Sequence, residues 1–433
     1  MSMIKENPRY SCALGGALST VKAIHRFIPI IHCGPGCGMM LYNGQNFIAG
    51  YSGGGYIGGA TIPSTNTYEK DIVFGAEKRL KQIISSTIEV VDGDLYFVLT
   101  GCTAEIIGDD IAAVISGYNE KNISVIHAST GGFSGTNYEG YNKVWGAIVG
   151  QLLEERPRNK KLVNLFGIVP AADVFWQGNI GEIARLLSGL GLEVNTFFTG
   201  RQDIGNVKDS SSAALNIVLS PWLAEEPLKI YEKKFGIPYL RYPGLPVGPT
   251  ATENFLRLVS DKLKLNKKKL DKFLDTEKQY VYDFFDKSAM VVTGFGIQHS
   301  IAVVGDSSTA VGVTKFLAED FSQIPVLVAI TDEPPENARE EIRKVLSSME
   351  YPNPPAVVFS SDQWTISLEI KKASATYVLG SSLDKEIAQE LAIPQLSISF
   401  PVSDRLILDR SIAGFRGAVS LVEDFITPCV AAL

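Results

Sequence analysis

Short apolar runs rich in β-branched residues recur along the chain, and each is followed by a glycine or polar turn and a helical pattern. These runs are continuously apolar, which is typical of parallel strands covered by helices on both faces. The sequence therefore predicts an α/β protein with mainly parallel, doubly wound sheets. The clearest runs are Leu95–Thr100, Ile123–His127, Leu162–Phe166, Ala214–Leu219, Ile301–Val304, Pro325–Ile330, Ala356–Phe359 and Ala375–Leu379.

The length of the chain predicts three Rossmann-like domains. At roughly 150 residues per domain, 433 residues accommodate about three, each with its own core. The charged stretch 154–161 indicates a solvated crossing, and a helical pattern ends near Asp286. We therefore expect domains at 1–158, 159–286 and 287–433. The strand, turn and helix that begin at Ile301 lack the GxGxxG fingerprint, so a dinucleotide site is not favoured there.

The charge and hydropathy of the chain argue against nucleic-acid and membrane partners. Lys plus Arg number 40 and Asp plus Glu number 47, which gives a net charge of −7. The six-lysine segment 262–272 is interpreted as an amphipathic surface helix. No window approaches the ~18 consecutive apolar residues that span a bilayer, and the first twenty residues lack a signal-peptide pattern. We expect a cytoplasmic protein with no nucleic acid and no membrane among its partners.

Glycine and cysteine are concentrated in one early region. Ten of the 26 residues from Gly34 to Gly59 are glycine, a density that costs backbone entropy and indicates close backbone approach to something embedded there. Cys33 and Cys37 lie at its start, Cys12 lies upstream, and Cys102 directly follows a strand at the mouth of a helix. Open α/β sheets place ligands at that edge, and a helix N-terminus favours a thiolate.

Three interpretations of Cys12, Cys37 and Cys102 stay open on the residues alone. Five cysteines are too few for a disulfide scaffold in a chain of this length. The three thiols are either small buried side chains, ligands of an iron–sulfur cluster, or part of a zinc or redox site. Zinc prefers four ligands in closely spaced pairs, and no second pair accompanies Cys33 and Cys37.

Several motifs, in order and spacing, resemble the nitrogenase component 1 (dinitrogenase) family over essentially the whole chain. Each motif alone is weak, and their combination is specific. They are Cys12 with Gly15 and Gly16, His32–Cys37, Glu69–Ala76, Cys102–Asp110, Gly132–Tyr141, Phe235–Pro238 followed by Pro246–Pro249, Phe400–Arg405, and Gly414–Ala418.

The resemblance implies an oxidoreductase subunit that shares an iron–sulfur centre with a homologous α-like subunit in an α2β2 heterotetramer. Cys12, Cys37 and Cys102 would be its thiolate ligands here, in an 8Fe-7S P-cluster-like centre or a 4Fe-4S cluster. Thr136 falls where the β subunit of molybdenum nitrogenase has a serine that approaches the oxidised cluster. Phe74 falls on the docking surface for the ATP-dependent iron protein; its alternative interpretation is a core residue of a helix from Ile72 to Ile84.

Other positions favour a β-like chain that lacks the second, larger cofactor of the α subunit. Ser220 and Ser399 fall where the α subunit anchors that cofactor with cysteine and histidine, and neither is a good iron ligand. Cys33 replaces a family glycine and is read as a fourth thiolate or a small buried residue. His299 is an unplaced candidate ligand, and Cys429 is expected to be structural.

We therefore expect an electron-relay subunit of a nitrogenase or nitrogenase-like reductase. The reduced substrate, dinitrogen or another, would bind in the partner. A scaffold subunit for nitrogenase-cofactor assembly is the alternative, and a zinc-stabilised α/β protein is a second rival.

Overall fold

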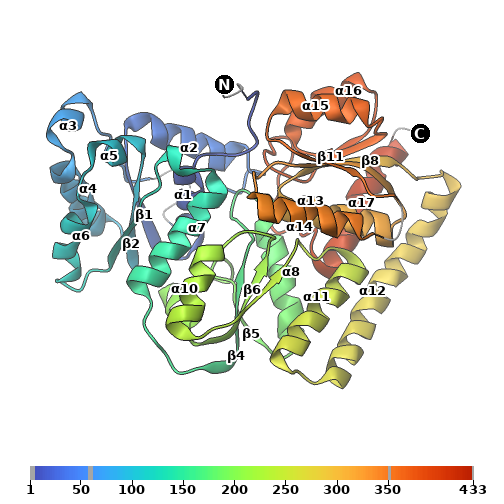
Figure 1. The fold of residues 1–433 in the computed structure, drawn as a ribbon, viewed down its shortest axis with the longest axis horizontal. Helices are drawn as coiled ribbons and strands as arrows, with labels where there is room; N and C mark the ends of the chain where they lie inside the picture. Colours follow the sequence, from blue (N-terminus) through green and yellow to red (C-terminus); the bar gives the residue numbers. More distant parts are fainter. Residues whose placement is uncertain (1–4, 57–61, 350–352, 432–433) are drawn as a thin grey trace.

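The computed structural model describes residues 5–56, 62–349 and 353–431, and it contains three parallel sheets (Figure 1). Every pairing between named strands in these residues is parallel. We call each sheet, with its helices, a unit. The first unit lies at the left of Figure 1, the second at the bottom and the third at the upper right. The α/β class with parallel, doubly wound sheets is confirmed.

The first unit has the strand order β1-β2-β3. Its strands are β1 (Phe27–His32), β2 (Leu95–Thr100) and β3 (Val125–Ala128). Its helices are α1 (Ala13–Ala23), α2 (Pro35–Phe47), α3 (Glu69–Phe74), α4 (Glu77–Val90), α5 (Cys102–Ile107), α6 (Ile111–Asn119) and α7 (Asn137–Ala147), with a 3-10 turn at Gly132–Ser134 and a π-helical turn at Ile148–Leu152.

The second unit has the strand order β5-β4-β6-β7. Its strands are β4 (Asn159–Phe166), β5 (Glu193–Asn195), β6 (Ala213–Leu219) and β7 (Tyr239–Tyr242). Its helices are α8 (Trp176–Gly189), α9 (Ile204–Asp209), α10 (Glu225–Phe235), α11 (Gly248–Leu263) and α12 (Lys267–Gly294), and a 3-10 turn lies at Ser210–Ser212.

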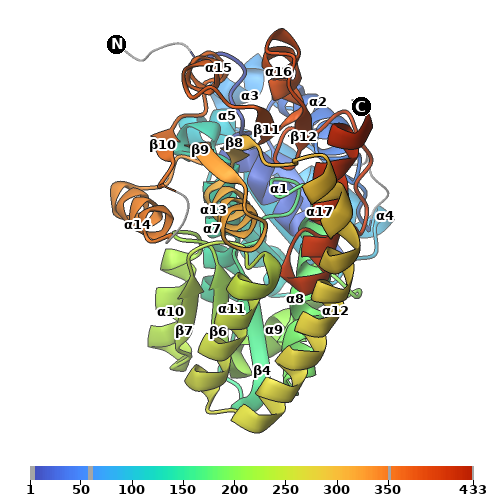
Figure 2. The ribbon, with the colours of Figure 1, turned by 90° about the vertical axis from the view of Figure 1, so that its right-hand side faces the viewer.

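The third unit has the strand order β10-β9-β8-β11-β12. Its strands are β8 (Ser300–Gly305), β9 (Ile324–Ile330), β10 (Ala356–Phe359), β11 (Tyr377–Gly380) and β12 (Gln395–Ser397). Its helices are α13 (Ser307–Lys315), α14 (Glu336–Ser347), α15 (Gln363–Lys372), α16 (Lys385–Glu390) and α17 (Gly414–Ala431), with a π-helical turn at Phe316–Asp320 and a 3-10 turn at Ser382–Asp384. In Figure 2, α17 runs beside α12 of the second unit, and it also contacts α8 and α11.

Alternate residues of each strand face opposite layers of helices, which is why the apolar runs are continuous. In β2, Tyr96 and Val98 belong to a core with side chains of α4 and α6. Phe97 and Leu99 face the other way, into a core that includes α1 and α7 and extends through all three units. A strand buried on both faces needs apolar residues at every position.

The closest helix contact in the first unit joins α1 to α7, and two glycines allow it. A Cβ atom on Gly16 would lie 1.8 Å from the carbonyl oxygen of Asn137, and one on Gly140 would lie 2.0 Å from that of Ala13. Only residues without a Cβ allow backbones to approach this closely. The contact matters for the site because Cys12 directly precedes α1 and Thr136 directly precedes α7.

The predicted domain boundaries fall at different kinds of structure. Residue 158 directly precedes β4, within an irregular and largely exposed stretch. Residue 286 instead lies inside α12, a single helix of 28 residues. The division at 1–158, 159–286 and 287–433 stays a prediction.

Candidate metal centre

Cys33, Cys37 and Cys102 follow the carboxyl ends of the neighbouring strands β1 and β2: Cys33 and Cys37 follow β1, and Cys102 follows β2. His32, the last residue of β1, pairs with Thr100, the last residue of β2, and the Gly101 N–H donates to the His32 carbonyl at 2.9 Å. Cys33 directly follows β1, and Cys102 is the first residue of α5. Because the strands are parallel and adjacent, their carboxyl ends place these cysteines at one edge of the sheet.

Cys12 and Cys102 converge on one backbone position, Gly132. The Gly132 N–H donates to Cys102 Sγ at 3.0 Å. A Cβ atom on Gly132 would lie 3.2 Å from Cys102 Sγ and 3.8 Å from Cys12 Sγ. An antiparallel bridge between Cys12 and Thr136 brings the N-terminal segment to this loop. The structure thus brings together Cys12, Cys102 and Thr136, which are far apart in the sequence.

Cys37 lies in the first turn of α2, four residues after Cys33. Interaction with the neighbouring Cys33 thiol lowers the pKa of the Cys37 thiol to about 6, and the same interaction together with burial raises that of Cys33. Cys33 is fully buried, its Sγ donates to the Gly34 carbonyl at 3.2 Å, and a Cβ atom on the adjacent Gly101 would lie 2.5 Å from its Cβ. Cys37 is only partly buried. The lowered pKa favours the thiolate form of Cys37.

Glu105 holds the Gly132 loop against the cysteines. Its Oε1 accepts hydrogen bonds from the Gly131 N–H and the Thr100 hydroxyl, both at 2.6 Å. Thr100 Oγ1 in turn accepts from the Thr130 N–H at 3.1 Å. This network ties the loop to the end of β2, so the Gly132 N–H keeps its direction toward Cys102.

His32 connects the end of β1 to Thr65 and Asp109 through hydrogen bonds. Its ring is fully buried, with Nδ1 3.0 Å from Thr65 Oγ1 and Nε2 2.9 Å from Asp109 Oδ2. Burial lowers the pKa of His32 despite the carboxylate. Both ring nitrogens are engaged, so His32 supports the site and is not a ligand.

Phe74 is exposed, and the expected helix from Ile72 to Ile84 is wrong. Gly75 breaks it with φ of 84°, so that α3 ends at Phe74 and α4 begins at Glu77. Phe74 is 87% exposed, which excludes the core interpretation. Other exposed apolar side chains lie close by in the chain: Met39 and Met40 are on α2 with Cys37, Ile106 is on α5 with Cys102, and Phe133 directly follows Gly132. Exposed apolar surface of this extent is typical of a protein interface.

The remaining candidate ligands do not join the cysteine group. Ser220 Oγ accepts from the Trp222 and Leu223 N–H groups, and Ser399 Oγ donates to the Val304 carbonyl at 2.7 Å. His299 Nε2 lies 3.4 Å from Cys429 Sγ in the third unit. Within the described ranges, no three His, Cys, Asp or Glu side chains are arranged to hold a single metal ion.

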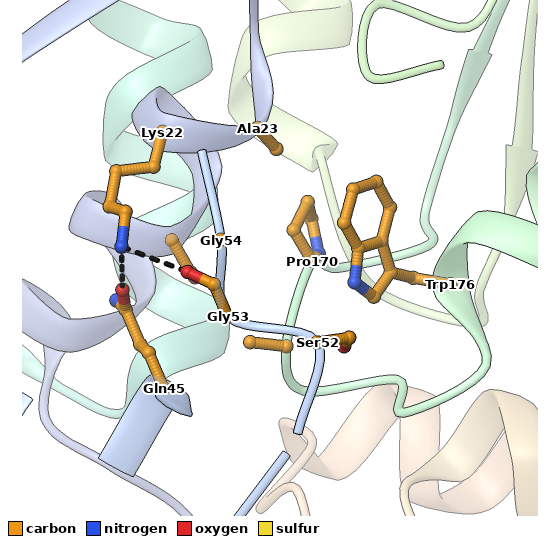
Figure 3. Close-up of a pocket in the computed structure, with 10 residues that line it drawn as sticks. Lys22, Ala23, Gln45, Ser52, Gly53, Gly54, Pro170 and Trp176 are labelled. Carbon is orange, nitrogen blue, oxygen red and sulfur yellow. Dashed lines mark hydrogen bonds between the residues drawn. The ribbon is translucent and has the colours of Figure 1, made fainter. Parts of the chain in front are cut away.

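A small cavity beside α1 contains a buried lysine that the sequence analysis missed. Figure 3 shows Lys22 Nζ donating to Gln45 Oε1 at 3.2 Å and to the Gly53 carbonyl at 3.1 Å, with Trp176 of the second unit opposite. Burial lowers the pKa of Lys22 to about 8. The cavity holds about 20 Å³, enough for a water molecule. Lys22 thus ties the glycine-rich segment to α1, and no sequence signal marks it.

The fold and these residues define an α/β protein with cysteine side chains at the carboxyl edge of its first sheet. Residues 12–429 match the model of the nitrogenase component 1 type oxidoreductases. The chain belongs to this family, as the motifs predicted. Separately, among the described residues no helix is long and apolar enough to cross a membrane.

The chain is similar to nitrogenase β chains. The β chain of the nitrogenase molybdenum-iron protein from Methanococcus maripaludis is 27% identical over 96% of this chain and 92% of that chain. The β chain of the vanadium-iron protein from Trichormus variabilis is 24% identical over 95% and 91%. A solved structure of nitrogenase Cp1 at pH 6.5 has a TM-score of 0.83 and 22% identity over 100% of this chain and 94% of that chain, which shows the shared fold.

Proposed function

We propose that this chain is the β-like subunit of a nitrogenase or nitrogenase-like reductase, and that Cys12, Cys37 and Cys102 bind an iron–sulfur cluster shared with a homologous α-like subunit. The observation that carries the proposal is the convergence of Cys12 and Cys102 on Gly132, at the sheet edge where Cys37 lies in the first turn of the helix that follows β1. When bound, such a cluster accepts and releases single electrons.

The donor set and its surroundings fit a cluster of this kind. Thiolates are the protein ligands of iron–sulfur clusters. Gly132 lacks a Cβ where one would press on Cys102 Sγ and on Cys12 Cβ, and its N–H donates to Cys102. Backbone N–H donors to ligand sulfurs tune reduction potential. The antiparallel bridge between Cys12 and Thr136 places Thr136, which carries a hydroxyl group, at the same edge of the sheet.

The surface position of the thiols supports a shared cluster. Cys12 is exposed, and Cys37 and Cys102 are partly buried. Three thiolates on one open surface leave part of a cluster uncovered, so a second chain would supply the other ligands and exclude water. The exposed Met39, Met40 and Phe133 provide apolar surface for that chain.

The buried serines support the assignment as the cofactor-less partner. Ser220 and Ser399 make their hydrogen bonds inside the protein and present no ligand to a second cofactor. The reducible substrate would then bind in the α-like subunit. The exposed Phe74 lies on α3, where an ATP-dependent iron protein would dock to deliver electrons.

The test is anaerobic co-purification of the full chain with its sister chain, followed by measurement of iron and of cluster absorbance. We expect Cys37→Ala and Cys102→Ala to lose most of both and to weaken the heteromer, because metal binding contributes to assembly. Cys429→Ala is the matched control and should retain wild-type iron. Wild-type iron content in Cys37→Ala would refute the ligand assignment.

Turnover separates the relay from the assembly scaffold. The complex, supplied with its iron protein and ATP, should reduce substrate. Persistent inactivity together with transfer of a cluster to another protein would instead identify the scaffold function.

A further inference from the structure

The side chain of Arg9 is fully buried in the third unit, although the residues that follow it belong to the first. Its Nη1 and Nη2 atoms donate to the two carboxylate oxygens of Asp384 at 2.8 and 2.5 Å, and neither side chain is exposed. Nη1 also donates to Ser381 Oγ at 2.8 Å, and Nη2 to Gln363 Oε1 at 2.5 Å. A two-point hydrogen-bonded pair of this kind fixes both distance and direction.

The third unit is shaped to receive this arginine. A Cβ atom on Gly380 would lie 2.1 Å from Asp384 Oδ2, so only glycine leaves room for the carboxylate. The Ser381 N–H donates to the same oxygen at 2.7 Å. A second attachment lies three residues earlier, where the Glu6 carbonyl accepts from the Gln363 N–H at 2.9 Å. The Glu6 N–H also donates to Asp362 Oδ1 at 2.6 Å, and Lys5 pairs with Glu333. The N-terminal segment is therefore held on the third unit by Lys5, Glu6 and Arg9, and Arg9 is the attachment nearest to Cys12.

The other end of the segment is held by the first unit. The Ser11 carbonyl accepts from the Asn137 N–H at 2.8 Å, and the Ala13 N–H donates to the Gly135 carbonyl at 3.0 Å. Cys12 lies between these two bonds, and its side chain is exposed. The three residues from Arg9 to Cys12 span at most about 10 Å. Residues 10 and 11 thus form a short link between the anchor at Arg9 on the third unit and the anchor on the first unit that contains Cys12.

We propose that Arg9 and Asp384 are positioning residues for Cys12, and that they set the place of this thiol relative to Cys102 from the third unit. The pair does not touch the proposed cluster and acts through the backbone of residues 10 and 11. The proposal rests on the proposed function only in taking Cys12 as a ligand. Stability by itself does not require a charged pair here, because apolar side chains of similar volume often stabilise a buried site equally well.

The test uses a variant that removes both charges, Arg9→Met with Asp384→Leu, in the full chain co-purified with its sister chain. The matched control is Arg410→Met with Asp424→Leu, which removes the two-point ion pair that joins Arg410 to α17. Hydrogen exchange at the Asn137 and Ala13 amides reports the Cys12 link, and iron retained after a chelator challenge reports the ligand.

We expect the Arg9 and Asp384 variant to exchange both amides about tenfold faster and to retain about threefold less iron, with a changed electron paramagnetic resonance signal. The control variant should match wild type in all three. A folded variant with wild-type exchange and wild-type iron would overturn the proposal. A wild-type complex without iron would contradict the proposed function, and the exchange rates would still decide the role of Arg9.

If the double variant does not fold, a conservative variant still tests the proposal. Arg9→Lys keeps the buried positive charge but has no planar pair of donors for the two oxygens of Asp384. It should fold and show faster exchange at Asn137 than wild type. Unchanged exchange in Arg9→Lys would also count against the proposal.

Discussion

At the scale of single residues, the site depends on what surrounds the sulfurs as much as on the cysteines. Cys33, interpreted from the sequence as either a ligand or a buried residue, is fully buried, and its Sγ donates to the Gly34 carbonyl at 3.2 Å. Gly132 brings a backbone N–H to Cys102 and leaves space beside Cys12. Both features belong to the layer around the ligands, which controls affinity and potential in metal sites.

Gly132→Ala tests this layer without changing a ligand. The new Cβ would lie 3.2 Å from Cys102 Sγ and 3.3 Å from Cys12 Cβ, so at least one cysteine must move. We expect iron retention in the complex to weaken about tenfold, measured as iron per chain after chelator challenge. Gly117→Ala is the control, since a Cβ there meets nothing within 4 Å. Equal iron in the two variants would contradict the prediction.

At the scale of elements, most of the longer apolar strands were predictable, including the edge strands β3 and β10, and the shortest edge strands were not. The run Leu95–Thr100 matches β2, because a continuous apolar run between a turn and a glycine is a strong local signal. The edge strands β5 and β12, of three residues each, carry too little apolar sequence to be recognised. The break at Gly75 was missed because the helical pattern continues on both sides of it.

The contact between α1 and α7 is the element on which Cys12 and Thr136 both depend. Gly140→Ala places a methyl group 2.0 Å from the Ala13 carbonyl oxygen, so the helices must separate. We expect the free energy of unfolding to fall by at least about 2 kcal/mol in urea titrations. Gly146→Ala in the same helix meets nothing within 4 Å and should raise it by about 0.5–1 kcal/mol. An unchanged free energy of unfolding in Gly140→Ala would show that the contact between α1 and α7 adjusts to the methyl group at little cost.

At the scale of the whole molecule, carboxyl groups gather where the three units meet. A cavity of about 10 Å³ is lined by Tyr138 of the first unit, Asp173 of the second and Asp306 of the third. Asp332 lies nearby and accepts from the Trp222 indole N–H at 2.8 Å. Burial, with the negative charge of Asp306, raises the pKa of Asp173 and of Asp332 to about 7. Burial likewise raises the pKa of Asp306 and Tyr138.

These shifts predict a pH dependence of stability. Carboxyl pKa values raised above the unfolded value of about 3.9 mean that the folded chain binds more protons between about pH 4 and 7. The stabilising contribution is complete below pH 4 and is lost as pH rises through about 7. The free energy of unfolding should therefore fall across this window, by up to about 1.4 kcal/mol per pH unit for each group.

Asp306→Asn makes this prediction specific to the junction. Asparagine still caps the N-terminus of α13, where Asp306 now accepts from the Ser308 and Thr309 N–H groups. Removal of its charge lowers the pKa of Asp173 and Asp332, so unfolding free energies measured in urea from pH 4 to 8 should decline less steeply. Asp110→Asn makes the same change at the exposed cap of α6 and serves as control. Identical slopes in the two variants would contradict the prediction.

The sequence by itself determined the α/β class, the main strands, the family and the cysteines that gather at β1 and β2. Apolar periodicity, turn residues and motif spacing act over a few residues, so they can be read locally. Only the tertiary structure decided that Arg9 is buried against Asp384, that Cys33 is fully buried, and that Gly132 faces Cys102. The Arg9 and Gly132 contacts join distant parts of the chain, and burial such as that of Cys33 depends on the packing of the whole fold.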